Sequence, residues 1–196
     1  MRRILVASVV SIVLMTAFFG FAYPVVMTGF AQVAFPSQAE GSLIRYNGTI
    51  VGSTLAAQLF SSASLFHERP SATTPAYNAA GTTFSNLGPT NPALAQLVAT
   101  NAQAVLMLES PYNPGLTIHD IPVDAVVPSA SGIDPEISLA YAQLQSQRVA
   151  AVRHLSLATV QSLIEENTDG RWLGLFGEPG VNVVKLNLAL IKLGGK

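Results

Sequence analysis

The stretch ILVASVVSIVLMTAFFGFA, residues 4–22, is an unbroken apolar run in which serine and threonine are the most polar side chains. As a helix its 19 residues would span ~28 Å at ~1.5 Å per residue, close to the ~30 Å hydrocarbon core of a bilayer. Only a helix satisfies its own backbone hydrogen bonds in lipid. We therefore predict that residues 1–35 form a short stub and a transmembrane helix.

Charge on either side of this run predicts its orientation. Arg2 and Arg3 precede it, and the next charged residue is Glu40. By the positive-inside rule the arginines stay cytoplasmic, so residues beyond about 36 should lie outside. Pro24 could kink or end the helix, or the uncharged residues 25–35 could continue it outward.

A cleaved signal peptide is the alternative, because Gly20-Phe21-Ala22 is an acceptable small-x-small cleavage site. The apolar run exceeds the ~7–15 residues that are usual for a signal h-region, which favours an uncleaved anchor.

Residues 36–196 are predicted to form one mixed domain of the α+β class. Asn47-Gly48 separates two short apolar runs, which is the strongest local signal of a β-hairpin. Residues 61–91 show no period, and a loop of that length is often functional. The other elements that we expect are strands at 121–127 and 181–184 and helices at 54–60 (capped by Ser53), from Asn91-Pro92 onward, from Ser138 to Arg153, at 157–167 (capped by Ser156) and at 186–193.

The predicted helix from Ser138 to Arg153 carries several polar side chains. Gln143, Gln145 and Gln147 lie on it together with Arg148 and Arg153. They form either a solvated face or a contact surface for another subunit or a polar ligand.

Composition and motifs exclude several classes of function. The chain has no cysteine and a net charge of −1, which exclude a disulfide miniprotein, a thiol nucleophile and a global field for nucleic acid. It has no phosphate-binding loop and no G-x-S-x-G elbow, and its three histidines are scattered, so we predict no metal site. A hydrolytic triad of Ser131, His67 and Asp124 could be assembled only if the fold brought them together.

Ten segments carry a family resemblance when they are taken together, with x at the positions that do not contribute to it. They are Tyr23-Pro24, FPxQAxGSLI (35–44), VGS (51–53), FHxRPSA (66–72), YN (77–78), SNLGPTNP (85–92), IPVD (121–124), SASGIDP (129–135), QxxRVA (145–150) and VNVVxLNLAL (181–190). Together they resemble the C subunit of the bacterial Kdp-type potassium-transporting ATPase. The resemblance runs in order from about residue 23 to 193, and its specificity comes from the ordered set. Glu68 departs from the family, which often has glycine there.

The resemblance implies a non-catalytic, single-pass subunit of a high-affinity potassium uptake complex in the bacterial inner membrane. Its partners would be a channel-like A subunit, a P-type B subunit that hydrolyses ATP, and a small fourth subunit. The family is needed for assembly and activity, and is proposed to act as a catalytic chaperone that raises the ATP affinity of the B subunit. The chain itself would hold no cofactor, with ATP and potassium bound at the level of the complex.

The resemblance also implies site residues. The proposed nucleotide contact of the family falls on Gln145, although the predicted topology places Gln145 outside and ATP is cytoplasmic. We expect Gln145→Ala to leave the outer domain folded. The candidate subunit contacts are Phe66, His67, Arg69, Pro70, Asn86, Asn91, Ser131, Asp134 and Arg148. The alternative function is a membrane-anchored, extracytoplasmic hydrolase or small-ligand binding domain.

Overall fold

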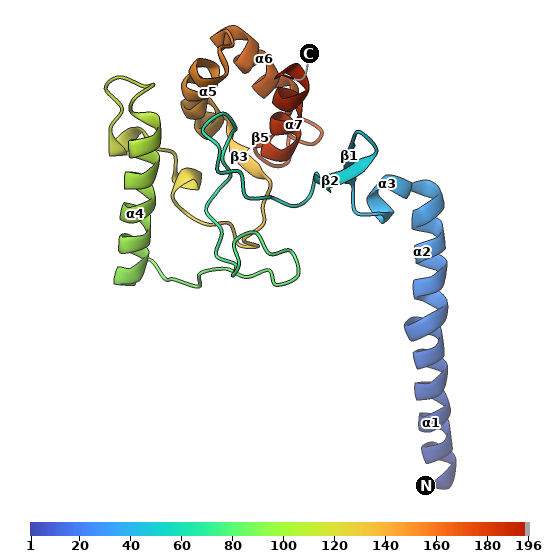
Figure 1. Cartoon of the computed structure of the whole chain (residues 1–196). Coiled ribbons are helices and arrows are strands. Elements are labelled where there is room, and N and C mark those ends of the chain that lie inside the picture. Colours follow the sequence, from blue (N-terminus) through green and yellow to red (C-terminus); the bar gives the residue numbers. More distant parts are fainter. Residues whose placement is uncertain (195–196) are drawn as a thin grey trace. The chain divides into compact units, whose positions relative to one another are not determined.

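The computed structural model describes residues 1–194, so the last two residues of the predicted outer domain lie outside the described part of the chain. The chain forms two compact units that divide between Val51 and Gly52. The predicted boundary at 35/36 stays a prediction. The combination of one long apolar helix with a helix-and-sheet unit (Figure 1) confirms the predicted α+β fold class.

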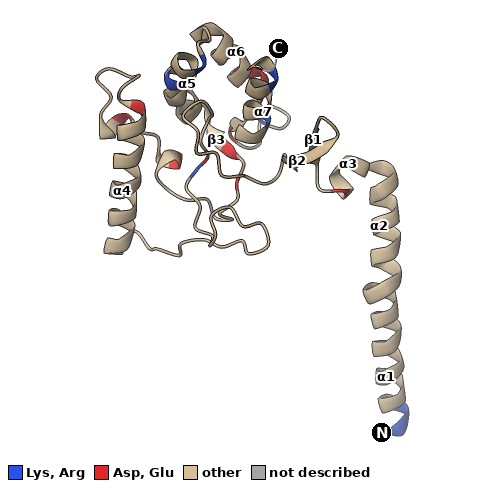
Figure 2. Cartoon of the chain, in the orientation of Figure 1, with Lys and Arg blue, Asp and Glu red and all other residues tan. Residues whose placement is uncertain are grey.

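The first unit begins with a continuous apolar helix over Arg2–Ala34, 33 residues long. It comprises α1 (Arg2–Ala17), the π-turn η1 (Phe18–Ala22) and α2 (Tyr23–Ala34), and no side chain in it is buried. After Arg2 and Arg3 no charged side chain interrupts it (Figure 2). It is the one helix among residues 1–194 that is long and apolar enough to cross a membrane.

Pro24 neither ends the helix nor breaks its path, and the π-turn explains why. A proline inside an α-helix removes one hydrogen bond and clashes with the carbonyl four residues earlier. Here the Tyr23 N–H bonds the Phe18 carbonyl, five residues back, so the backbone is already widened where the ring enters. The helix therefore continues to Ala34, as the uncharged residues 25–35 allowed.

A short helix, α3 (Pro36–Ala39), and all but the last two residues of a hairpin complete the first unit. The hairpin pairs β1 (Leu43–Tyr46) with β2 (Thr49–Ser53). Asn47 and Gly48 have φ values of 48° and 80°, the positive pair that a type I′ turn requires, so the hairpin prediction is confirmed.

The second unit contains a small antiparallel sheet and four longer helices. The sheet has the order β3–β5–β4, with Ile137 opposite Val181 and Thr168 also opposite Val181. In chain order, the elements of the second unit are α4 (Pro92–Glu109), the 3₁₀ turns η2 (Ile118–Asp120) and η3 (Val123–Ala125), β3 (Glu136–Ser138), α5 (Leu139–Arg153), α6 (Leu157–Glu166), β4 (Thr168–Asp169), β5 (Gly180–Asn182) and α7 (Val183–Gly194).

Helix starts follow the predicted caps. The side chains of Asn91, Ser138 and Ser156 each accept a backbone N–H of the first turn of α4, α5 and α6. Each cap satisfies an N–H group that has no partner within its helix.

The core of this unit lies where α5, α6, α7 and the sheet meet, and a segment from the predicted long loop enters it through Phe66. Its fully buried members include Phe66, Val149, Val160, Val181 and Leu186.

Two predicted elements are wrong. Residues 54–60 do not form a helix, although the Ser53 hydroxyl accepts the Leu55 N–H as a cap would. Long-range bonds take the backbone groups instead: the Ala57 N–H bonds the Ile133 carbonyl and the Thr54 carbonyl accepts from Asn182.

Residues 121–127 contain the 3₁₀ turn η3 rather than a strand. Ala125 and Val126 are both buried, and adjacent buried residues do not fit the two-residue period of a half-buried strand. The strand predicted at 181–184 ends at Asn182. The Asn182 side chain accepts the Lys185 N–H and so caps the start of α7.

Candidate functional site

The strongest polar assembly in the structure surrounds residues 63–68, here called the clamped segment. No strand among residues 1–194 pairs with this segment, yet two side-chain amides bond its main chain on both donor and acceptor groups. Gln145 of α5 accepts the His67 N–H at 2.7 Å and donates to the His67 carbonyl at 3.0 Å. Asn187 of α7 does the same for Phe66, at 2.8 and 2.9 Å.

This geometry is what an extended chain requires. Each residue of an extended strand exchanges its N–H and C=O with one neighbour, and successive residues face opposite sides. Phe66 therefore bonds α7 and His67 bonds α5. Gln145 and Asn187 take the place of adjacent strands, and both are fully buried.

Arg148 of α5 joins this clamp to the rest of the core. Its Nε donates to Glu109 Oε1 at 2.8 Å, and its Nη2 donates to Gln145 Oε1 at 2.8 Å. Its Nη1 bonds the carbonyls of Ala63 and Leu65. A planar guanidinium presents its donors in a rigid fork, which a lysine would not reproduce.

The Arg148–Glu109 ion pair is almost completely buried, with side-chain exposures of 0% and 1%. Burial raises the pKa of Glu109, and the charge of Arg148 opposes that rise. Within residues 1–194 the second carboxylate oxygen, Oε2, has no hydrogen-bond partner. The pair ties α4 to α5, and loss of either charge would leave the other buried and unpaired.

The end of α5 contributes a second arginine. Arg153 donates from Nε to the Ser64 carbonyl at 2.9 Å and from Nη1 to the Leu190 carbonyl at 2.7 Å. It therefore connects the clamped segment to α7, near the carbonyl groups at the end of that helix.

The chain that follows the clamped segment is bonded to the predicted 129–135 loop. The Ser71 hydroxyl donates to the Gly132 carbonyl at 2.6 Å and accepts the Tyr77 N–H at 3.0 Å. A Cβ on Gly132, whose φ is +71°, would lie 2.7 Å from Thr73 Cγ2 and 2.8 Å from the Thr83 carbonyl oxygen. Only glycine fits this approach.

An ion pair lies at the surface of the same two loops. Arg69 contacts Asp134 at 3.3 Å, and both side chains are partly exposed. The Tyr77 hydroxyl donates to the Arg69 carbonyl at 2.9 Å. The loops at 69–78 and 129–134 thus form one hydrogen-bonded surface feature, which holds four of the predicted contact residues: Arg69, Pro70, Ser131 and Asp134.

A cleft of about 350 Å³ opens beside the clamped segment, lined by Phe60, Glu68, Tyr77, Tyr141 and their neighbours. Burial raises the pKa of Glu68 to about 8, and backbone N–H groups of Glu68, Phe60 and Gln58 oppose the rise. Burial lowers the pKa of His67, as does the charge of Arg148. The cleft is mostly apolar with a few polar groups, which is typical of small-ligand pockets.

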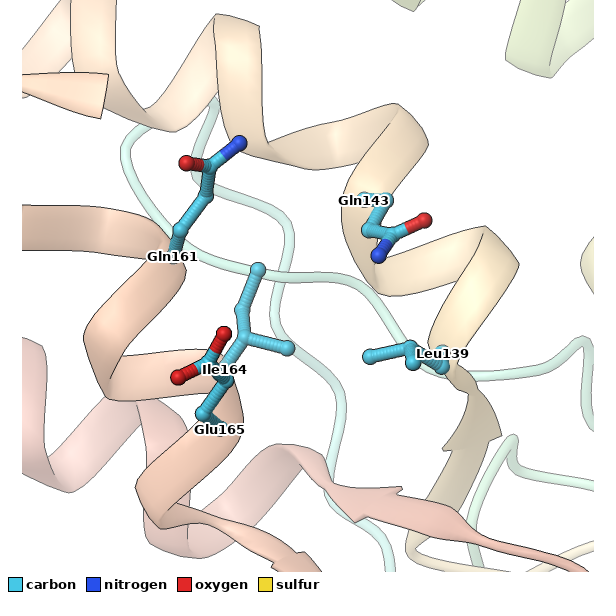
Figure 3. Close-up of a pocket in the computed structure, with 5 residues that line it drawn as sticks. All are labelled: Leu139, Gln143, Gln161, Ile164 and Glu165. Atoms are coloured by element: carbon cyan, nitrogen blue, oxygen red, sulfur yellow. The ribbon is translucent and has the colours of Figure 1, made fainter. Parts of the chain in front are cut away.

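A second, smaller groove of about 250 Å³ lies between α5 and α6. Figure 3 shows Leu139 and Gln143 on one side and Gln161, Ile164 and Glu165 on the other. Its amides and carboxylate can form hydrogen bonds with a polar group, but they do not form a nucleophile–base arrangement.

The predicted site residues differ widely in their burial. Asn86 and Asn91 are exposed, and His67 is half-buried. Phe66, Gln145 and Arg148 are fully buried. Gln145 and Arg148 therefore belong neither to a solvated face of α5 nor to a surface that contacts another subunit or a polar ligand. Their amide and guanidinium groups stabilise the interior of the unit, because a buried polar group needs partners.

The three residues of the conceivable triad bond elsewhere. Asp124 accepts the N–H and hydroxyl of Ser138, His67 Nε2 contacts the Ser62 carbonyl, and the Ser131 hydroxyl accepts the Ile133 N–H. No hydrogen bond joins Ser131, His67 and Asp124 to one another in the described part of the chain. Over the same residues no three His, Asp or Glu side chains group as metal ligands would.

Sequence reasoning missed Glu109 and Asn187, although both left a signal. Glu109 is the only charged residue in the 18 residues of α4, and Asn187 lies among the apolar residues of α7. A lone polar group on an apolar face indicates a buried partner.

Comparison with known proteins finds one family along nearly the whole chain. The family described as "KdpC: K+-transporting ATPase, c chain" matches residues 5–192. A potassium-transporting ATPase KdpC subunit of Burkholderia orbicola is 49% identical over 192 residues, 97% of this chain and 96% of the relative. KdpC subunits of Methylibium petroleiphilum (191 residues, 97% of each chain) and Sorangium cellulosum (184 residues, 93% of this chain and 94% of the relative) are both 48% identical. The chain therefore belongs to the KdpC family of potassium-transporting ATPase subunits.

Proposed function

We propose that this chain is a non-catalytic accessory subunit of an ATP-driven potassium uptake complex, required for its assembly and activity. The observation that carries the proposal is the KdpC match over residues 5–192, which includes both the apolar helix and the second unit. ATP hydrolysis belongs to a P-type B subunit, potassium passes through a channel-like A subunit, and a small fourth subunit completes the assembly.

We further propose that the long helix spans the bacterial inner membrane with its N-terminus in the cytoplasm. Arg2 and Arg3 support this orientation, since they are the only charges before Glu40. The helix acts as an uncleaved anchor.

The contact surface for the large subunits is proposed to include the joined loops at 69–78 and 129–134 and the exposed residues Asn86 and Asn91. Functional loops are typically held by a rigid scaffold. Here the clamped segment and the Ser71–Gly132 bond supply that scaffold. Phe66 and Arg148 would contribute by positioning these loops.

For Gln145, we propose that any effect on ATP affinity passes through the clamped segment. Both amide atoms of Gln145 are bonded inside the unit, and the side chain has no exposed area. An indirect role also removes the conflict between an outer domain and cytoplasmic ATP.

Co-purification tests the proposal. A tagged copy of this chain, extracted from the membrane at native expression level, should carry two larger membrane subunits and potassium-stimulated ATPase activity. Cells that lack only this chain should fail to grow at limiting potassium and recover with the intact gene. A chain that purifies alone while the pump keeps full activity without it would overturn the proposal.

A further inference from the structure

The loop between β4 and β5 exposes four large apolar side chains within five residues. Trp172, Leu173, Leu175 and Phe176 are 69%, 72%, 77% and 61% exposed. Scattered exposed apolar residues are normal, but a contiguous set marks a surface that contacts a protein or a membrane.

The loop has a defined shape. Trp172 and Phe176 exchange backbone hydrogen bonds at 2.8 and 3.0 Å, and their rings lie 5.7 Å apart between centroids. Leu173 has φ +52°, a conformation that bulky residues rarely adopt. Backbone bonds from Gly174 to Arg171 and from Leu175 to Trp172 hold this turn, so the four exposed side chains are carried by one compact turn.

Charge is confined to the neck of the loop. Arg171 donates to both carboxylate oxygens of Glu178, at 2.9 and 2.8 Å, and residues 172–177 carry no formal charge. The loop thus has an uncharged end at residues 172–177 and an Arg171–Glu178 ion pair at its base. A bilayer has the same sequence of polarity, because its uncharged hydrocarbon lies beneath zwitterionic headgroups. Tryptophan favours that interface because its ring is apolar and its N–H can bond to headgroups or water.

We infer that residues 172–176 insert into the outer leaflet of the membrane that the helix spans. The inference rests on the spanning helix of the proposed function, but not on the pump partners. Only residues 35–51 separate the helix end at Ala34 from the second unit, so the bilayer is always at high effective concentration. Interfacial elements of this kind reach ~5–10 Å into the headgroup and acyl boundary.

Trp172 is the only tryptophan in the chain, which makes the test direct. The full chain is reconstituted into lipid vesicles of phosphatidylcholine and phosphatidylglycerol, with or without brominated acyl chains, and is excited selectively at the tryptophan. We expect brominated lipid to reduce Trp172 emission at least twofold. We also expect acrylamide to quench Trp172 several-fold less in these vesicles than in urea.

The matched variants separate the loop from general surface hydrophobicity. Leu173→Ser/Leu175→Ser should abolish most of the brominated-lipid quenching, whereas Leu55→Ser/Leu59→Ser should retain it. Leu55 and Leu59 are comparably exposed, at 63% and 67%. Circular dichroism melting of each variant checks that the second unit is folded.

Two results would overturn the inference. The first is emission that brominated lipid leaves unchanged while acrylamide quenches it as in urea. The second is protection of Trp172 only when the other pump subunits are co-reconstituted, which assigns the loop to a protein partner. Either result would leave the co-purification expected of the proposed function intact.

Discussion

The side-chain amide of Gln145 pairs with the main chain of His67 as a neighbouring strand would, through hydrogen bonds of 2.7 and 3.0 Å. The same Gln145 oxygen also accepts from Arg148. Gln145 thus links the segment at 63–68 to the buried ion pair with Glu109.

Gln145→Ala should destabilise the second unit, which replaces our expectation from sequence that this variant leaves the fold intact. Removing the amide leaves the N–H and carbonyl of His67 without their partner, at a cost of about 2 kcal/mol. Thermal unfolding of the full chain in detergent, followed by circular dichroism, measures the loss. Gln147→Ala is the control, since Gln147 lies on the same helix and is exposed. Equal melting temperatures for the two variants would contradict the clamp.

The ATP dependence of the assembled pump distinguishes positioning from direct contact. If Gln145 acts through the clamped segment, Asn187→Ala should shift the ATP dependence in the same direction as Gln145→Ala. A shift with Gln145→Ala alone, at equal loss of stability, would instead support a nucleotide contact.

Arg148→Met should be among the most damaging substitutions. It leaves Glu109 buried without its partner and frees the carbonyls of Ala63 and Leu65, at about 3–5 kcal/mol. Adding Glu109→Gln should restore part of that loss, because the unpaired charge is removed while the carbonyls stay unpaired. Chemical unfolding of the single and double variants measures this coupling, and strictly additive losses would argue against the ion pair.

Glu68 should make stability depend on pH. Its pKa is about 8 in the folded chain against an ordinary value of 4.5, so the folded state binds this proton more tightly than the unfolded state. The stability contribution is complete below pH 4.5 and is lost as pH rises through 8, on the order of 5 kcal/mol. Glu68→Gln should flatten unfolding stability between pH 6 and 9 (about 1.4 kcal/mol per pKa unit), whereas the exposed Glu165→Gln should not.

Gly132→Ala and Gly115→Ala form a matched pair. Both glycines have positive φ, 71° and 86°, so each substitution costs about 1 kcal/mol of backbone strain. An added Cβ meets Thr73 and Thr83 at Gly132, but nothing within 4 Å at Gly115. We expect Gly132→Ala to lower the melting temperature clearly more than Gly115→Ala, and similar losses would show that the loops at 71–83 and 129–134 are not tightly joined.

The absence of native cysteine makes orientation easy to measure. Gln147→Cys, on the exposed face of α5, should react with a membrane-impermeant maleimide in cells whose outer membrane alone is permeabilised. A cysteine inserted directly after Met1 should react only after the inner membrane is opened. The reverse pattern would place the second unit in the cytoplasm.

Local signals predicted the long helix, the hairpin at Asn47-Gly48 and the starts of α4, α5 and α6. Each depends on residues close in sequence: an apolar run, a positive-φ turn pair, or a cap that bonds the next turn. The family itself was identified from the resemblance of the ordered segments, and the match to KdpC confirms it.

The clamped segment could not be predicted in this way. Its partners Gln145 and Asn187 are 78 and 121 residues distant in sequence, and neither lies in a strand. The predicted helix at 54–60 and the predicted strand at 121–127 were wrong for a related reason. Groups distant in sequence, in Ile133, Asn182 and Ser138, form hydrogen bonds with residues of these two segments. Contacts of this range depend on the assembled fold rather than on local preference.

The run without charge between Arg3 and Glu40 has an electrical consequence. A charge that crosses the membrane field exchanges about 2.3 kcal/mol for every 100 mV. Side chains between Arg3 and Glu40 have no formal charge to move, so a shift or tilt that keeps the two arginines at the membrane surface does no such work against the membrane voltage. Voltage sensitivity of the transport cycle would then arise in the chains that carry the ion and its coordinating groups.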